Sequence, residues 1–252
     1  MWLILAFCSA ALLGFYDVCK KHALSGNAVL PVLFLNTAIC SLLFLPFIIL
    51  SSYTGLLDSS SFYVEPCGWE QHRYILLKAC IVLSSWIFGY FAMKHLPITI
   101  VGPINATRPV MVLVGALLVF GERLNVWQWA GVTLAIISFF LLKRSGKKEG
   151  VDFRHNKWIF SLILAAVLGA VSGLYDKYLM APPENGGVGL SRMVVQSWYN
   201  LYQLAMMGLT MLMIWWPTRK NSTPFTWKWS IIFISLFLSA ADFVYFYALS
   251  LP

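Results

Sequence analysis

Apolar residues occur along the chain in long stretches that are separated by short polar segments. Eight such stretches lie near residues 2–21, 30–50, 74–94, 98–120, 125–142, 158–180, 190–215 and 229–249. About twenty apolar residues cross the hydrocarbon core of a bilayer as a helix. A helix closes its own backbone hydrogen bonds in lipid, and the two-residue alternation of a membrane β-barrel does not occur in these stretches. The pattern therefore predicts an all-α fold, a polytopic membrane helix bundle.

The amino-acid composition is that of an integral membrane protein. Hydrophobic residues make up 60% of the 252 residues and charged residues 11%, whereas about a quarter of a soluble domain is charged. The net charge is +8, and its basic residues gather in loops, where they fit membrane topology and lipid headgroups better than nucleic acid. The cysteines and histidines lack the spacing of a metal site, so we expect neither a metal nor a cofactor.

Two short motifs and a single asparagine occur twice, in the same order, on either side of a basic segment. Gly14-Phe15-Tyr16-Asp17 matches Gly173-Leu174-Tyr175-Asp176, Asn36 corresponds to Asn200, and Tyr90–Pro97 matches Tyr245–Pro252. The basic segment, residues 143–157, carries six Lys or Arg residues and two acidic ones. We therefore predict a duplication, with a first repeat of five helices at 1–142, a linker at 143–157 and a second repeat at 158–252.

An odd number of helices in each repeat places the two copies in opposite orientations in the membrane. Inverted repeats of this kind build many secondary transporters, whose substrate lies near the middle of the bilayer. The second repeat contains only three predicted helices and ends at Pro252, the counterpart of Pro97. We therefore expect the chain to lack the last two helices of a ten-helix protein, and to be unstable or inactive by itself.

One segment carries residues that are typical of a known family. It contains Leu96-Pro97, Pro103 and Pro109, then Gly121-Glu122-Arg123-Leu124, and then Trp127-Gln128-Trp129-Ala130-Gly131 at the start of the fifth predicted helix. These motifs resemble the EamA-type branch of the drug/metabolite transporter superfamily. The resemblance implies two five-helix units that together form a ten-helix carrier for small metabolites. The second Gly-Glu-Arg loop of the family pattern is absent here.

Ionisable residues inside the apolar stretches are the main site candidates, because each costs at least about 2.5–3.5 kcal/mol at the centre of a bilayer. Asp17 lies near the end of the first stretch, where Lys20 and Lys21 follow at i+3 and i+4. It is either an interfacial acid neutralised by these lysines or a carboxylate that faces a central cavity and binds a substrate amine or a proton. Asp176 occupies the matching position in the second repeat, and Asp242 lies in the middle of the last predicted helix.

Arg108 is a cation near the middle of the fourth stretch, where Pro103 and Pro109 predict a broken helix. We expect Arg108 to hold a substrate carboxylate or to pair with a buried acid, with Asn105 on a similar face. Uncharged candidates are either site residues or packing residues that join neighbouring helices. They are Asn36, Asn200, Tyr16, Tyr175 and Trp86.

These candidates predict a secondary active transporter, and not an enzyme, that imports or exports a small polar metabolite by alternating access. The expected partners are the small-molecule substrate, a coupling proton and the lipid bilayer; nucleic acid is not expected, and a homodimer is left open. We expect a multi-pass protein of the plasma membrane, of the bacterial inner-membrane type. Two alternatives stay open at this point: a polytopic membrane enzyme acting on a lipid-linked substrate, and a non-transporting scaffold.

Overall fold

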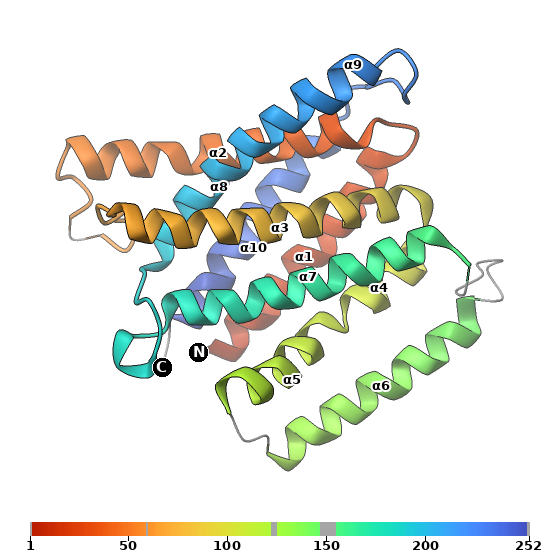
Figure 1. Cartoon of the computed structure of the whole chain (residues 1–252), viewed down its shortest axis with the longest axis horizontal. Coiled ribbons are helices and arrows are strands. Elements are labelled where there is room, and N and C mark those ends of the chain that lie inside the picture. Colours follow the sequence, from red (N-terminus) through yellow and green to blue (C-terminus); the bar gives the residue numbers. More distant parts are fainter. Residues whose placement is uncertain (1, 59, 122–124, 147–154, 251–252) are drawn as a thin grey trace. The chain divides into compact units, whose positions relative to one another are not determined.

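The computed structural model describes residues 2–58, 60–121, 125–146 and 155–250, and these residues form helices and loops without a β-strand. The all-α prediction is thereby confirmed for this part of the chain. Figure 1 shows the long helices α1 (Trp2–Leu24), α2 (Val29–Tyr53), α3 (Trp69–His95), α4 (Ile98–Asn105), α5 (Arg108–Phe120), α6 (Val126–Gly146), α7 (Lys157–Met180), α8 (Arg192–Thr210) and α10 (Ser230–Leu249). Short turns complete this set, namely η2 (Pro183–Asn185), η3 (Met211–Trp215) and α9 (Trp216–Thr218).

The predicted membrane stretches correspond to these helices. The stretch near 190–215 comprises α8 and the π-helical turn η3, and the stretch near 98–120 comprises α4 and α5. Five of the described segments are long and apolar enough to cross a membrane, which agrees with a multi-pass membrane protein. They are Val29–Tyr53, Trp69–His95, Ile98–Val119, Lys157–Met180 and Ser230–Leu249.

The break between α4 and α5 follows from the prolines of this segment. α4 ends at Asn105 and α5 begins at Arg108, so that Pro109 lies in the first turn of α5. Pro109 has no backbone N–H and therefore cannot donate the helical hydrogen bond to the Asn105 carbonyl. The chain tightens here, because the Thr107 amide bonds to the Ile104 carbonyl, three residues back. The predicted broken helix is confirmed.

The family-like motif lies where α5 ends and α6 begins. α5 ends at Phe120, and the next residue is Gly121, whose φ of 65° lies in the left-handed region that favours glycine. At the start of α6, the Asn125 and Gln128 side chains each accept a hydrogen bond of 2.8 Å from the other's backbone amide, a capping box. Glu122, Arg123 and Leu124, like residues 147–154 of the linker and residues 251–252, lie outside the described residues.

The helices form two compact units that share α3 and α7. The first unit contains residues up to Leu83 and from Asp176 onward, and the second unit contains Ser84–Tyr175. In the first unit, α1 packs along α10, and α2 packs against α8 and α10. In the second unit, α6 packs against α4 and α5. The first unit therefore combines helices from both halves of the sequence, and it holds the buried charges that are described next.

Candidate functional site

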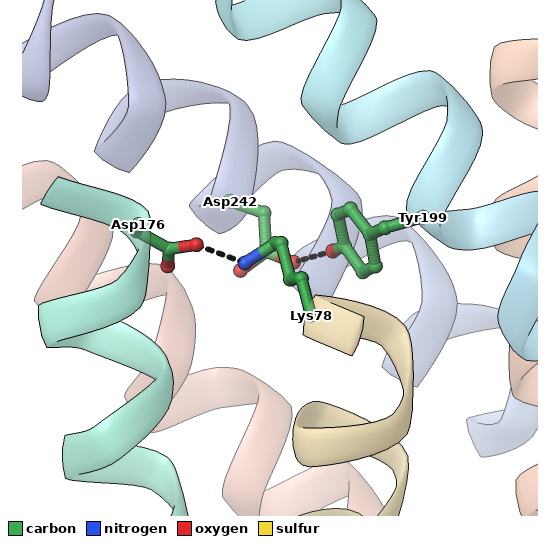
Figure 2. Close-up of polar contacts among 4 residues, drawn as sticks. All are labelled: Lys78, Asp176, Tyr199 and Asp242. Carbon is green, nitrogen blue, oxygen red and sulfur yellow. Dashed lines mark hydrogen bonds and ion pairs between the residues drawn. The ribbon is translucent and has the colours of Figure 1, made fainter. Parts of the chain in front are cut away.

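A lysine and an aspartate form a buried ion pair in the first unit. Lys78 lies in the third turn of α3 and Asp176 near the end of α7, and these residues are 2% and 4% exposed. The Nζ atom of Lys78 donates a hydrogen bond to Oδ1 of Asp176 (Figure 2). Two charges removed from water are stable only when they are paired and hydrogen-bonded. The pair therefore fixes α3 against the end of α7.

A second carboxylate lies beside this pair. Asp242 of α10 accepts a hydrogen bond from the hydroxyl group of Tyr199 on α8, and Figure 2 shows the four side chains turned toward one another. Lys78 Nζ also lies 4.9 Å from the centre of the Tyr199 ring and 5.0 Å from that of Phe246. Aromatic faces attract a cation, most strongly where water is excluded. Four helices thus contribute to one group of polar side chains, which we call the charged cluster: Lys78, Asp176, Tyr199 and Asp242. The first three are buried and Asp242 is half-buried.

The charged cluster contains more negative than positive charge. When Lys78 and the two carboxyl groups are ionised and Tyr199 is neutral, Lys78 contributes +1 and the two carboxylates contribute −2, so that the sum is −1. Asp242 has only the neutral hydroxyl of Tyr199 as its hydrogen-bond donor among the described residues. Such an arrangement is able to hold a proton or the cationic group of a ligand, because either would neutralise the remaining charge.

A seam of uncharged polar groups joins α2, α8 and α10. Ser235 donates to the side-chain oxygen of Asn36 at 3.0 Å, and Ser41 donates to the backbone carbonyl of Asn200 at 2.8 Å. Gln196 donates to the Ser239 carbonyl at 3.2 Å, one turn of α10 away from Asp242. The seam therefore begins beside the charged cluster and continues along α8. The buried face of this helix is polar, although α8 belongs to a membrane protein.

Two amides in this seam have unused hydrogen-bonding atoms. Asn36 and Gln203 are both fully buried. Within the described residues, Nδ2 of Asn36 and both Nε2 and Oε1 of Gln203 have no hydrogen-bond partner. Each such atom costs about 1–3 kcal/mol relative to a satisfied one. The packing of α2, α8 and α10 thus leaves polar groups that a hydrogen bond from water or from a polar ligand would stabilise.

The sequence candidates on α1 form a separate, local group. Lys20 pairs with Asp17 at 2.6 Å, and its Nζ atom lies 4.2 Å from the centre of the Tyr16 ring. Tyr16 and Lys20 are buried and Asp17 is half-buried. Of the two lysines that follow Asp17, Lys20 forms an ion pair with it, and Lys21 is half-buried.

The remaining sequence candidates belong to the second unit. Arg108 begins α5, and its guanidinium packs against Gly169 of α7, where an added Cβ would lie 3.1 Å from Cζ, Nε and Nη1 of the arginine. Asn105 ends α4, and its Oδ1 atom has no hydrogen-bond partner among the described residues. Trp86 on α3 and Tyr175 on α7 are half-buried. Within the described residues, no group of three or more His, Cys, Asp or Glu side chains is arranged to hold a metal ion.

Two members of the charged cluster, Lys78 and Tyr199, are not among the residues that the sequence singles out. Lys78 meets the criterion that singles out Arg108, because each is a lone charge inside an apolar stretch. Tyr199 carries no such signal, because aromatic residues are common in membrane helices. Of the sequence candidates, Asp176 and Asp242 lie in the charged cluster, and Asn36 and Asn200 lie in the polar seam.

Comparison with known proteins matches residues 1–144, more than half of the chain, to the EamA-like transporter family. The chain is also similar to UDP-galactose transporter homolog 1 of Kluyveromyces lactis, with 23% identity over 84 residues. That match covers 32% of this chain and 25% of the yeast protein, so it spans about a quarter of the relative's length. The family match agrees with the resemblance of the segment from Leu96 to Gly131. The chain belongs to the EamA-like transporter family.

Proposed function

We propose that this EamA-like transporter is a secondary transporter that binds a small zwitterionic or amine-bearing metabolite at the charged cluster and moves it by alternating access. The observation that carries this proposal is the grouping of the buried Lys78 and Asp176 with the half-buried Asp242 within a membrane protein. An ionisable residue inside a membrane is a functional candidate, because its cost has no structural benefit that an apolar residue would not supply.

The charge of the cluster supports this substrate class. Two carboxylates and one lysine favour a ligand with a positive group, because that group would balance the excess negative charge. A zwitterion would place its ammonium group near Asp242 and its carboxylate near Lys78. Lys78 would then exchange one carboxylate partner, Asp176, for another. During this exchange of partners, the aromatic faces of Tyr199 and Phe246 would stabilise the ammonium group of Lys78 or that of the ligand.

The name of the yeast relative suggests a different substrate, UDP-galactose. That molecule carries a pyrophosphate group, which requires several cationic partners. The charged cluster offers one lysine and two carboxylates, and its net negative charge would repel a pyrophosphate. The charges of the cluster therefore favour a zwitterionic or cationic substrate for this chain over a nucleotide sugar.

Energy for accumulation would come from an ion gradient. The sequence contains no Gly-x-x-x-x-Gly-Lys-Ser/Thr phosphate-binding motif. We propose that a proton is the coupling ion and that Asp242 carries it, because this carboxylate has a neutral donor, Tyr199, and not a cation as its hydrogen-bond partner. A proton and the ammonium group of the substrate would then compete for Asp242. A carrier that exchanges protons for substrate requires such competition.

The proposal extends to the arrangement of the chain in the membrane. We propose that residues 1–142 and 158–252 belong to two inverted repeats joined by the basic linker. The repeated Tyr-Asp motif at Asp17 and Asp176 supports this arrangement, as does the composition of the first compact unit, which takes α1 and α2 from one half and α8 and α10 from the other. Because the family consists of transporters, transport is favoured over the alternative of a membrane enzyme acting on a lipid-linked substrate.

A thermal-shift screen of the purified full-length protein against metabolites of known charge tests the substrate class. Zwitterions or amines are expected to raise the melting temperature of the wild type, and to raise that of Asp242→Asn by less. The matched control is Glu184→Gln, which neutralises an exposed acid in the turn between α7 and α8. Stabilisation by anions alone, or stabilisation that Asp242→Asn leaves unchanged, would refute the proposed site.

A further inference from the structure

A pocket of about 460 Å³ lies outside the charged cluster, between the α2–α3 loop and the start of α8. Its lining includes Asp58 and Glu65 from the loop, and Ser191 and Arg192 from the start of the helix. Its volume falls in the range of about 300–1,000 Å³ that is typical of small-molecule sites. No residue of this pocket is among the candidates that the sequence singles out.

One wall of the pocket is positive and rigidly built. The Arg192 guanidinium lies 4.2 Å from the centre of the Tyr247 ring and 5.3 Å from that of Phe243, and its Nη2 atom donates to the Ser61 carbonyl at 3.2 Å. Among the described residues, Nη1 of Arg192 and Oγ of Ser191 have no hydrogen-bond partner. The N-terminus of α8 adds its partial positive charge at the same place. This wall is able to receive a carboxylate.

The other wall of the pocket is negative. Asp58 and Glu65 are exposed, and neither forms an ion pair within the part of the chain that the structure describes. Two residues that lie between these acids in the sequence are held in place, because Phe62 stacks on Phe243 with ring centres 5.6 Å apart, and the Ser61 carbonyl accepts the hydrogen bond from Arg192. These acids are therefore presented beside the arginine without being neutralised by it, and they are able to receive an ammonium group.

The pocket and the charged cluster have the same set of charges and share two helices. Each contains one basic and two acidic groups. Arg192 and Tyr199 are seven residues apart on α8, which corresponds to about 10 Å along the helix. On α10, Phe243, which packs on Arg192, directly follows Asp242. A ligand that suits one of the two sites would suit the other.

We propose that this pocket is an outer binding site for zwitterionic ligands, with the ligand carboxylate at Arg192 and Ser191 and its ammonium group at Asp58 and Glu65. It collects the substrate about two helical turns away from the charged cluster. The substrate class rests on the function proposed above, whereas the existence of the pocket site depends only on its own residues.

Ligand-observed saturation-transfer NMR on the full-length protein in nanodiscs tests the outer site. The probes are 4-aminobutyrate, butyrate and butylammonium, which share one carbon chain and differ in charge. The wild type is expected to bind 4-aminobutyrate about tenfold more tightly than either singly charged probe, the gain expected of one additional charge-assisted contact. Equal binding of the three probes by the wild type would overturn the inference.

Variants then assign the binding to the pocket. The Asp58→Asn/Glu65→Gln double variant changes only exposed loop side chains, so it keeps the fold even if Arg192→Gln does not. In the Asp242→Asn background, where the charged cluster no longer contributes, both are expected to weaken 4-aminobutyrate binding about tenfold, to the level of a singly charged probe, while Glu184→Gln does not. Asp242→Asn is expected to retain this binding, because the outer site does not include the charged cluster. Loss in Asp242→Asn with no loss in the loop double variant would overturn the inference.

The failure of this inference is distinguishable from the failure of the proposed function. If the pocket binds the zwitterion but the wild type moves no such compound across a membrane, the proposed function fails and the outer site stands. If the wild type moves a zwitterion and the loop double variant moves it with unchanged KM, the outer site fails and the proposed function stands. A rise in KM of about tenfold at unchanged kcat in the loop double variant supports both.

Discussion

Lys78 is the residue around which the other buried charges are arranged. It pairs with Asp176, and Asp242 lies beside it (Figure 2). Its ammonium group also lies within about 5 Å of the ring centres of Tyr199 and Phe246. A lysine that is only 2% exposed has lost most of its contact with solvent, so its stability depends on its partners. The two carboxylates therefore determine whether Lys78 stabilises or destabilises the fold, and this dependence is open to measurement.

Removal of one member of the buried pair is predicted to destabilise the protein more than removal of both. Lys78→Met leaves the Asp176 carboxylate buried without its cation, which costs about 3–5 kcal/mol of unfolding free energy. The double variant Lys78→Met/Asp176→Leu removes the orphaned charge and is expected to recover most of this loss. The measurement is denaturant unfolding in detergent micelles, with Lys220→Met, at an exposed loop lysine, as the control.

A double variant whose loss equals the sum of the two single losses would contradict this prediction. Additive losses mean that the two residues do not interact, because coupling appears only as a departure from additivity. The ion pair between α3 and α7 would then contribute nothing to the fold.

At the scale of helices, the sequence predicted the elements well because lipid leaves the backbone few alternatives. Every backbone group must be bonded inside the membrane, so the lengths of the apolar stretches nearly determine the helices, and Pro109 determines where the fourth stretch breaks. The pairing of Lys78 with Asp176 was not predicted, because these residues are 98 positions apart. Which faces of α3 and α7 meet depends on packing, and no local pattern in the sequence encodes it.

The polar seam between α2, α8 and α10 gives a prediction of increased stability. Gln203→Met replaces a fully buried amide, whose oxygen and nitrogen have no partner among the described residues, by an apolar side chain of similar length. It is expected to raise the free energy of unfolding by about 1–3 kcal/mol, because no unsatisfied polar group remains. Thermal melts in detergent provide the measurement.

The matched control for this prediction is Gln128→Met. The same substitution there removes a side-chain oxygen that accepts a hydrogen bond from the Asn125 amide at the start of α6, so stability is expected to fall by about 0.5–1.5 kcal/mol. If Gln203→Met also lowers stability, the Gln203 amide is satisfied in the folded protein, and the seam contains no unsatisfied group at this position.

The break between α4 and α5 gives a second prediction at this scale. Pro109→Ala supplies an N–H group that is able to donate to the Asn105 carbonyl, so α4 and α5 are expected to join into a longer helix. Hydrogen–deuterium exchange measures this directly, with slowing by about tenfold expected at residues 109–112. Pro46→Ala, at a proline inside the continuous helix α2, is the control and should leave this segment unchanged. Unchanged exchange in Pro109→Ala would show that packing, and not the proline, causes the break.

At the scale of the whole molecule, the first compact unit combines helices from both halves of the chain. The first unit takes α1, α2 and part of α3 from the N-terminal half, and the end of α7 with α8 and α10 from the C-terminal half. The charged cluster accordingly draws Lys78 from one half and Asp176, Tyr199 and Asp242 from the other. Motion of one half relative to the other would change the distances within the cluster, which is the coupling that alternating access requires.

The most direct test of this account is transport by proteoliposomes that contain the full-length protein and are loaded with a mixture of zwitterionic, cationic and anionic metabolites. Efflux is followed by mass spectrometry, so the substrate need not be known beforehand. The wild type and the Glu184→Gln control are predicted to release a zwitterionic or amine-bearing metabolite. Lys78→Met and Asp242→Asn are predicted to lower its initial rate by at least about tenfold, the equivalent of about 1.4 kcal/mol. Wild-type rates in both of these variants would contradict the assignment of the charged cluster as the transport site.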